Sequence, residues 1–140
     1  MTMSEAEMVW TDDGWCMACG RNNPRGLHMK FRHEGDHYVC DFMPERFHQG
    51  WEGIVHGGIL ATLLDEAMND MLSRNGTTVA TAELNVRYKL PAKTGVPLKV
   101  RAWMTRERPP LWEAAGDITD ADGRVVATGT AKLMRVQADI

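Results

Sequence analysis

The longest helical pattern in the chain lies between Gly53 and Gly76, and it constrains the fold more than any other feature. After Gly58 no helix breaker occurs until Gly76, and apolar residues recur at helical spacing at Leu60, Leu64, Ala67 and Met71. This spacing predicts one helix over residues 55–74, about 30 Å long at about 1.5 Å per residue. Because strand-like stretches lie on both sides of it, we expect this helix to form the centre of the core.

Two adjacent carboxylates, Asp65 and Glu66, fall at different positions around this helix. Successive helical residues are turned by about 100°, which puts Asp65 on the margin of the apolar face. Glu66 falls in the polar sector together with Asp70, so we expect Glu66 to be solvated. A carboxylate on the margin of a buried face is half desolvated and can meet a partner surface. An acid that is hydrogen-bonded to a neighbouring element is an equally good interpretation of Asp65.

The start of the predicted helix carries two adjacent glycines, Gly57 and Gly58. The first N–H groups of a helix lack intrahelical partners, and the peptide dipoles leave about half a positive charge at that end. Since glycine has no Cβ, a ligand oxygen can approach these N–H groups closely. Such a site suits a carbonyl oxygen that gains negative charge when its carbon is attacked. A Gly-Gly pair is also common in tight turns, but its place at a helix start favours the binding interpretation.

Length and composition predict one soluble domain. The 140 residues suffice for one core, and a hydrophobic content of 44% with a charged content of 25% is ordinary for globular proteins. We expect a single domain over residues 1–140, in which residues 1–15 form a short helix or a loose arm. A net charge of −3 and a pI near 5.9 argue against nucleic acid or an anionic membrane as the main partner. No signal peptide and no membrane span are recognisable, so we expect a cytoplasmic protein.

The three cysteines do not suggest a disulfide framework, but Cys16 and Cys19 form a Cys-x-x-Cys pair. The later histidines His33 and His37 complete a spacing that matches two-Cys, two-His zinc sites. A zinc finger needs its histidines on a helix, whereas residues 34–36 between them have turn chemistry, with alternating apolar residues on either side. We therefore expect a β-hairpin with both histidines at its tip, a buried pair of reduced thiols, and no metal.

The remaining pattern predicts two strands before the helix and four after it. Residues 80–90 alternate between apolar and polar side chains, with Thr81 on the polar face, and Pro91 ends this strand. Further strands are expected over residues 96–104, 112–118 and 125–136, with a turn at 120–123 and a bend at Gly129. The connections are too short for parallel crossovers, so the sheet should be antiparallel. An α+β fold follows, in which a curved antiparallel sheet wraps around one long central helix.

These residues resemble a known family. The His56-Gly57-Gly58 triplet, followed by Asp65 nine positions after the histidine, is similar to the hotdog-fold acyl-CoA thioesterases, above all the phenylacetate-pathway (PaaI-type) branch. Residues 81–92, which end in Tyr-x-x-Pro-Ala, look like the central strand of that family, and residues 16–27 are similar to the opening of many members. The resemblance covers roughly residues 16–136.

The resemblance implies hydrolysis of an acyl-CoA thioester without a cofactor. The Gly57 N–H would polarise the carbonyl, and Asp65 would act as general base or as nucleophile. In this family the aspartate faces the acyl group across a dimer interface, which implies a homodimer or a dimer of dimers. Thr81 matches a position that holds the water, although a threonine chosen only for its strand propensity fits equally well. Gln49 would position the carbonyl if the loop before the helix is one residue longer than in relatives.

Other residues have weaker assignments. His56 is expected to be a hydrogen-bonding residue near the helix cap and, with Gly58, to line the substrate site, while His48 is expected to be an exposed loop residue. Candidates for the phosphates of CoA are Arg46, Arg87, Lys89 and Lys93. No Gly-x-Ser-x-Gly motif is present, which excludes a serine hydrolase of that type. A hotdog hydratase and a non-catalytic acyl-CoA-binding protein are the alternatives, and Asp65 favours the enzyme.

Overall fold

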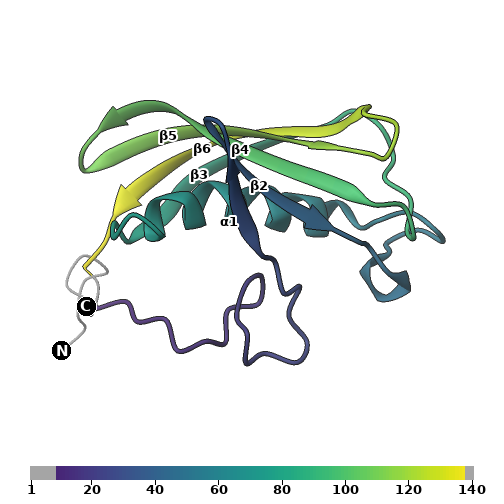
Figure 1. Ribbon diagram of the computed structural model, residues 1–140, viewed down its shortest axis with the longest axis horizontal. Coiled ribbons are helices and arrows are strands. Elements are labelled where there is room, and N and C mark those ends of the chain that lie inside the picture. Colours follow the sequence, from purple (N-terminus) through teal and green to yellow (C-terminus); the bar gives the residue numbers. More distant parts are fainter. Residues whose placement is uncertain (1–8, 138–140) are drawn as a thin grey trace.

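The computed structural model describes residues 9–137, in which one long helix lies against one face of a curved six-stranded antiparallel sheet (Figure 1). The helix is α1 (Gly57–Ser73), and the strands lie in the order β1-β2-β4-β5-β6-β3. Their bounds are β1 (Phe31–Glu34), β2 (His37–Phe42), β3 (Val79–Tyr88), β4 (Leu98–Arg108), β5 (Leu111–Thr119) and β6 (Val125–Arg135). The predicted hotdog arrangement, with two strands before the helix and four after it, is confirmed. Of the expected arm, residues 1–8 lie outside the described residues.

Helix α1 begins and ends within two residues of its predicted bounds. His56 is the N-cap residue, and its Nδ1 accepts a hydrogen bond from the N–H of Gly58 over 2.8 Å. Arg74 is the C-cap, and Gly76 adopts a φ of 84°, which an L side chain rarely takes. No helix of the described residues is long and apolar enough to cross a membrane.

The apolar face of α1 packs on the middle of the sheet, where Leu63, Leu64 and Met68 are fully buried. Gly116 of β5 and Gly129 of β6 are paired in register beneath Leu64. A Cβ on Gly129 would meet Leu64 Cδ1 at 3.2 Å, and one on Gly116 would meet Cδ2 at 3.3 Å. Gly129 was expected to allow a bend, but its absent side chain also lets the helix approach the sheet closely.

The first hairpin forms as predicted, with the turn at Gly35 and Asp36 between β1 and β2. This hairpin covers a side of α1 that the helical wheel assigned to solvent. Asp70 is buried there, and its Oδ2 accepts a hydrogen bond from the Tyr38 hydroxyl over 2.5 Å. The placement of Asp70 in a solvated sector was therefore wrong, because the wheel contains no information about the neighbouring strand.

Strand β3 lies at the edge of the sheet and pairs only with β6 within the described part of the chain. The register shifts between Thr81 and Glu83, so that Ala82 is an extra residue in a β-bulge. One extra residue moves the side chains on either side of it to opposite parity. Thr81 therefore faces α1, as do Leu84 and Val86 beyond the bulge, which pack against the core. The assignment of Thr81 to the outward polar face was wrong for this reason.

Strand β4 differs most from its predicted bounds, whereas β5 and β6 agree with theirs to within one residue. Strand β4 continues to Arg108, four residues beyond the predicted 96–104, before the Pro109-Pro110 turn. The turn at 120–123 forms as predicted, and Asp120 Oδ1 accepts hydrogen bonds from the N–H groups of Asp122 and Arg124.

Candidate active site

The central contact of the candidate site joins Asp65 on α1 to Thr81 on β3. The Thr81 hydroxyl donates a hydrogen bond to Asp65 Oδ1 over 2.6 Å, and both residues are half-buried. A carboxylate with one oxygen occupied in this way keeps a fixed orientation, and its second oxygen remains available as a proton acceptor. The half-buried position predicted for Asp65 is confirmed. The bulge at Ala82 makes the contact possible because it turns Thr81 toward the helix.

Asp65 and Thr81 line a cavity of about 750 Å³ between α1, the start of β3 and the N-terminal segment 10–19. In Figure 1 this segment runs along the side of α1 that faces away from the sheet. The Trp10 N–H donates to the carbonyl of Gln137 over 2.8 Å, which ties the segment to the end of the chain. Five carboxylates line the cavity, and none of its lining residues within 9–137 is Lys or Arg: the acids are Asp12, Asp13, Asp65, Glu66 and Asp70.

Glu66 is half-buried against Cys16 and Cys19, so the expectation that it is solvated was wrong. Burial raises the pKa of the Glu66 carboxyl, and burial together with the nearby Glu66 raises the pKa of the Cys19 thiol. The Cys16 thiol lies 3.9 Å from Glu66 Oε1. The N-terminal loop therefore covers the polar side of α1, which no periodicity within the helix could indicate.

The N-terminus of α1 is the second part of the candidate site. The Gly57 N–H has no acceptor among residues 9–137, and it lies at the positive end of the helix. The carbonyl of Gly57 accepts a hydrogen bond from the Tyr88 hydroxyl over 2.8 Å. The Tyr88 ring also covers the glycine, since a Cβ on Gly57 would meet it at 3.4 Å. Sequence reasoning assigned no role to Tyr88, although its Tyr-x-x-Pro-Ala motif was a usable signal.

Gly57 and Asp65 are well separated within one chain. Eight residues of helix correspond to about 12 Å along the axis at about 1.5 Å per residue. A carbonyl group spans little more than one bond, so it cannot contact the Gly57 N–H and the Asp65 carboxylate of the same chain. Within one chain, the Gly57 N–H and the Asp65 carboxylate therefore lie at different places along the helix.

Hydrogen bonds within the loop before α1 hold Gln49 in place. Gln49 Oε1 accepts a hydrogen bond from the Gly53 N–H over 3.1 Å, and Gln49 pairs with Val55 in an isolated bridge. The side-chain oxygen of Gln49 is thus used inside the loop, and only its amide NH2 group is left for a ligand.

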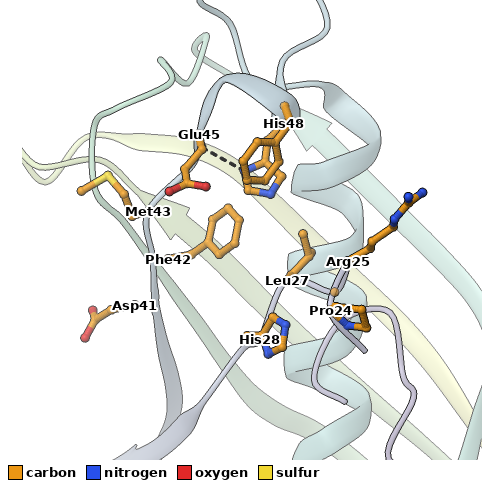
Figure 2. A pocket seen from close by; sticks show the side chains of 11 residues that line it. Pro24, Arg25, Leu27, His28, Asp41, Phe42, Met43, Glu45 and His48 are labelled. Carbon is orange, nitrogen blue, oxygen red and sulfur yellow. Dashed lines mark hydrogen bonds between the residues drawn. The ribbon is translucent and has the colours of Figure 1, made fainter. Parts of the chain in front are cut away.

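His48 is buried, and the expectation of an exposed loop histidine was wrong. Its Nδ1 accepts a hydrogen bond from the Glu45 N–H over 2.9 Å, as Figure 2 shows, and its carbonyl accepts one from the His56 N–H. Burial lowers the pKa of the His48 imidazole.

The cavity in Figure 2, of about 700 Å³, lies beside this loop. Its lining residues include Arg25, His28, Glu45 and Phe47. Because it contains neither Asp65 nor Thr81, it is separate from the candidate site.

The predicted phosphate ligands Arg87 and Lys89 lie exposed at the end of β3 and just beyond it. Neither side chain forms an ion pair within residues 9–137, so both charges face solvent. Arg46 is also exposed, in the short 3-10 helix Arg46–His48 before α1, and Lys93 is exposed in the loop between β3 and β4. His56 and Gly58 lie at the helix cap, and both are exposed.

The chain is similar to known proteins both in sequence and in structure. The family model described as thioesterase superfamily matches residues 52–127. The chain is 30% identical over 94 residues to acyl-coenzyme A thioesterase 13 of Mus musculus. The aligned region covers 65% of this chain and 67% of the mouse protein.

Two solved structures are also similar. A crystal structure of a thioesterase superfamily protein superposes with a TM-score of 0.77 at 27% identity, over 85% of this chain. The match spans 62% of the length of that protein. A phenylacetic acid degradation-related protein from Ralstonia eutropha JMP134 has a TM-score of 0.70 at 26% identity, over 77% of this chain and 85% of that one.

Proposed function

Because this chain belongs to the thioesterase superfamily and is a thioester hydrolase, we propose that its substrate is an acyl-CoA and that Asp65 drives the hydrolysis. The observation that carries the proposal is the 2.6 Å hydrogen bond from Thr81, which orients a half-buried carboxylate into a cavity of about 750 Å³. The mouse relative is named an acyl-coenzyme A thioesterase, which supports an acyl-CoA as the substrate. The R. eutropha protein is described as related to phenylacetic acid degradation, so aryl acyl groups belong among the substrates to be tested.

In the proposed reaction, Asp65 takes a proton from water while the water oxygen forms a bond to the thioester carbon. The carbonyl oxygen gains negative charge and accepts a hydrogen bond from a Gly57 N–H at a helix N-terminus. The C–S bond then breaks, and the proton passes from Asp65 to the departing thiolate, giving a free acid and CoA. Direct attack by Asp65, with hydrolysis of the resulting anhydride, gives the same products.

We further propose that each site is shared between two chains of a homodimer. The separation of about 12 Å along α1 puts Gly57 and Asp65 of one chain too far apart for a single carbonyl. Strand β3 is a ten-residue edge strand without an internal proline, and such an edge favours pairing with a second copy. Pairing of two β3 strands would extend the sheet across both chains and bring Arg87 and Lys89 of each toward the partner.

These cations are proposed to bind the phosphates of CoA, and the acidic cavity to hold the acyl group. Arg87 and Lys89 are exposed and free of ion pairs within residues 9–137, which suits phosphate binding. The five carboxylates of the cavity would repel an anion, so the acyl group should be uncharged. Gln49, through its amide NH2 group, and His56 are proposed to line the entrance near the helix cap.

The test measures release of CoA from short, medium and aryl acyl-CoA substrates. Replacement of the oriented base by Asp65→Asn should lower kcat about a hundredfold or more. Asp122→Asn, the same chemical change in the exposed 120–123 turn, is the matched control and should leave kcat near that of the wild type. Release of an enoyl-CoA from a 3-hydroxyacyl-CoA, without free CoA, would instead identify the hydratase alternative.

A mixing experiment tests the shared site. Asp65→Asn and Gly57→Val disable opposite halves, so mixed dimers should recover activity at up to one site in each dimer. A fully active monomer in sedimentation would contradict this part of the proposal.

A further inference from the structure

The structure assembles a cluster of three candidate metal ligands beside the proposed site. One ligand atom from each of Cys16, Cys19 and Glu66 lies within 4.8 Å of the other two. Thiolates bound at about 2.3 Å to one tetrahedral zinc ion are roughly 3.8 Å apart, so small side-chain rotations would complete this geometry. All three residues are half-buried, which shields a bound ion without closing its route of entry. We propose that Cys16, Cys19 and Glu66 bind a thiophilic divalent cation of the Zn²⁺ class.

The turn around Cys16 directs two backbone N–H groups at its sulfur atom. The N–H groups of Ala18 and Cys19 point at Cys16 Sγ, over 3.3 and 3.4 Å. These two donors could also satisfy the sulfur of a metal-bound cysteine, because hydrogen bonds around a metal site hold its ligands in place. The turn closes through Gly20, whose N–H donates to the Cys16 carbonyl over 2.9 Å. A Cβ on Gly20 would lie 2.3 Å from the Cys16 nitrogen, so the turn requires a glycine at this position.

The electrostatics of the cavity also favour a cation. The cluster lies in the cavity that also contains Asp12, Asp13 and Asp65, and no Lys or Arg of the described residues lines it. Metal binding would deprotonate the two thiols and the carboxyl group, and the divalent cation would offset most of the resulting negative charge. The acidic lining alone would not define a site, but the paired thiols give it the ligand chemistry of zinc.

The ligand set differs from the one that the sequence spacing offered. His33 and His37 lie at the tip of the β1–β2 hairpin, where their rings pack on Tyr38 and Trp103 at 5.0 Å between centroids. The third ligand is Glu66, which spacing could not connect to a loop fifty residues earlier. The proposed ligand set differs from the reduced thiols without a metal that the sequence led us to expect.

Three protein ligands leave one position of a tetrahedral ion for a water molecule from the cavity. The bound ion would join the loop around Cys16 to α1, one residue after Asp65. It would thereby hold segment 10–15, including Trp10 and Trp15, over the proposed acyl site. This role is structural, so metal binding can be measured without any assumption about the reaction.

The experiment uses the full chain purified under reducing conditions from a zinc-supplemented culture. Elemental analysis should find about one zinc per chain. Cobalt added to the metal-free protein should give thiolate-to-metal charge-transfer absorption, with saturation at one equivalent. Cys16→Ser and Cys19→Ser should abolish this absorption, and Glu66→Gln should weaken zinc binding at least about tenfold. A chelator should lower the Tm of the wild type but not that of Cys19→Ser.

The double variant His33→Ala, His37→Ala is the matched control and should bind zinc as tightly as the wild type. Loss of zinc from this control would overturn the assignment in favour of the two-Cys, two-His set. Zinc well below one equivalent, with no cobalt charge-transfer band in the folded wild type, would overturn the proposal altogether. Retention of full affinity in Glu66→Gln would remove Glu66 from the ligand set. Because the cobalt spectrum of the wild type needs no variant, a cysteine variant that fails to fold does not affect this test.

Discussion

The hydrogen bond from Thr81 to Asp65 gives the sharpest prediction about catalysis. Thr81→Val removes the hydroxyl but keeps the branched shape, which suits a strand equally well. A hydrogen bond to a charged group is worth about 1.5–3 kcal/mol. If this bond selects the productive orientation of the Asp65 carboxylate, its loss reduces the productive fraction by about 10- to 150-fold, since about 1.4 kcal/mol corresponds to tenfold. The decrease should appear in kcat, while KM stays close to that of the wild type.

The assay is steady-state release of CoA from one neutral acyl-CoA, on variants whose urea midpoints match that of the wild type. Thr81→Ser keeps the hydroxyl and should retain kcat within a few-fold. In an Asp65→Asn background, Thr81→Val should have little further effect, because the group it orients is already lost. A Thr81→Val enzyme with kcat within about threefold of the wild type would refute the argument that this hydrogen bond orients the base.

Three further predictions follow from the same structure. The kcat/KM for an acyl-CoA with a carboxylated acyl group should be at least about tenfold lower than that for a neutral acyl-CoA of the same length, because five carboxylates line the cavity. Equal kcat/KM values for the two substrates would contradict the placement of the acyl group in this cavity. Since burial lowers the pKa of His48, the unfolded chain binds more protons below about pH 6.5, so the urea midpoint should decrease as the pH falls from 7.5 to 5.5. His48→Asn keeps an acceptor for the Glu45 N–H and should flatten this dependence; an unchanged slope would refute the assignment. Gly116→Ala should destabilise the folded protein by about 1–3 kcal/mol, because a Cβ there would lie 2.7 Å from a backbone oxygen. Gly129→Ala should destabilise it less, because the atom nearest to a Cβ on Gly129 belongs to the movable Leu64 side chain. Equal urea midpoints for the two variants would contradict this prediction.

Local patterns determined much of the fold. The helical spacing located α1 to within two residues, and the alternation with turn residues between the runs predicted six antiparallel strands in the observed order along the chain. The positions of Asp65, on the margin of the buried face, and of His56, at the cap, followed from the same spacing. These features depend on residues close in sequence, whose relative geometry is set by the element that contains them.

Contacts between distant segments were decided only by the tertiary structure. Alternation along residues 80–90 put Thr81 on the outer face, and the bulge at Ala82 reversed that assignment, because one extra residue changes the parity of every side chain beyond it. The helical wheel put Glu66 and Asp70 in one polar sector of α1, but it could not indicate which segments cover them. A loop fifty residues earlier lies against Glu66, which is half-buried, and β2 lies against Asp70, which is buried. A residue's direction is local, whereas its environment is set by the packing of the whole chain.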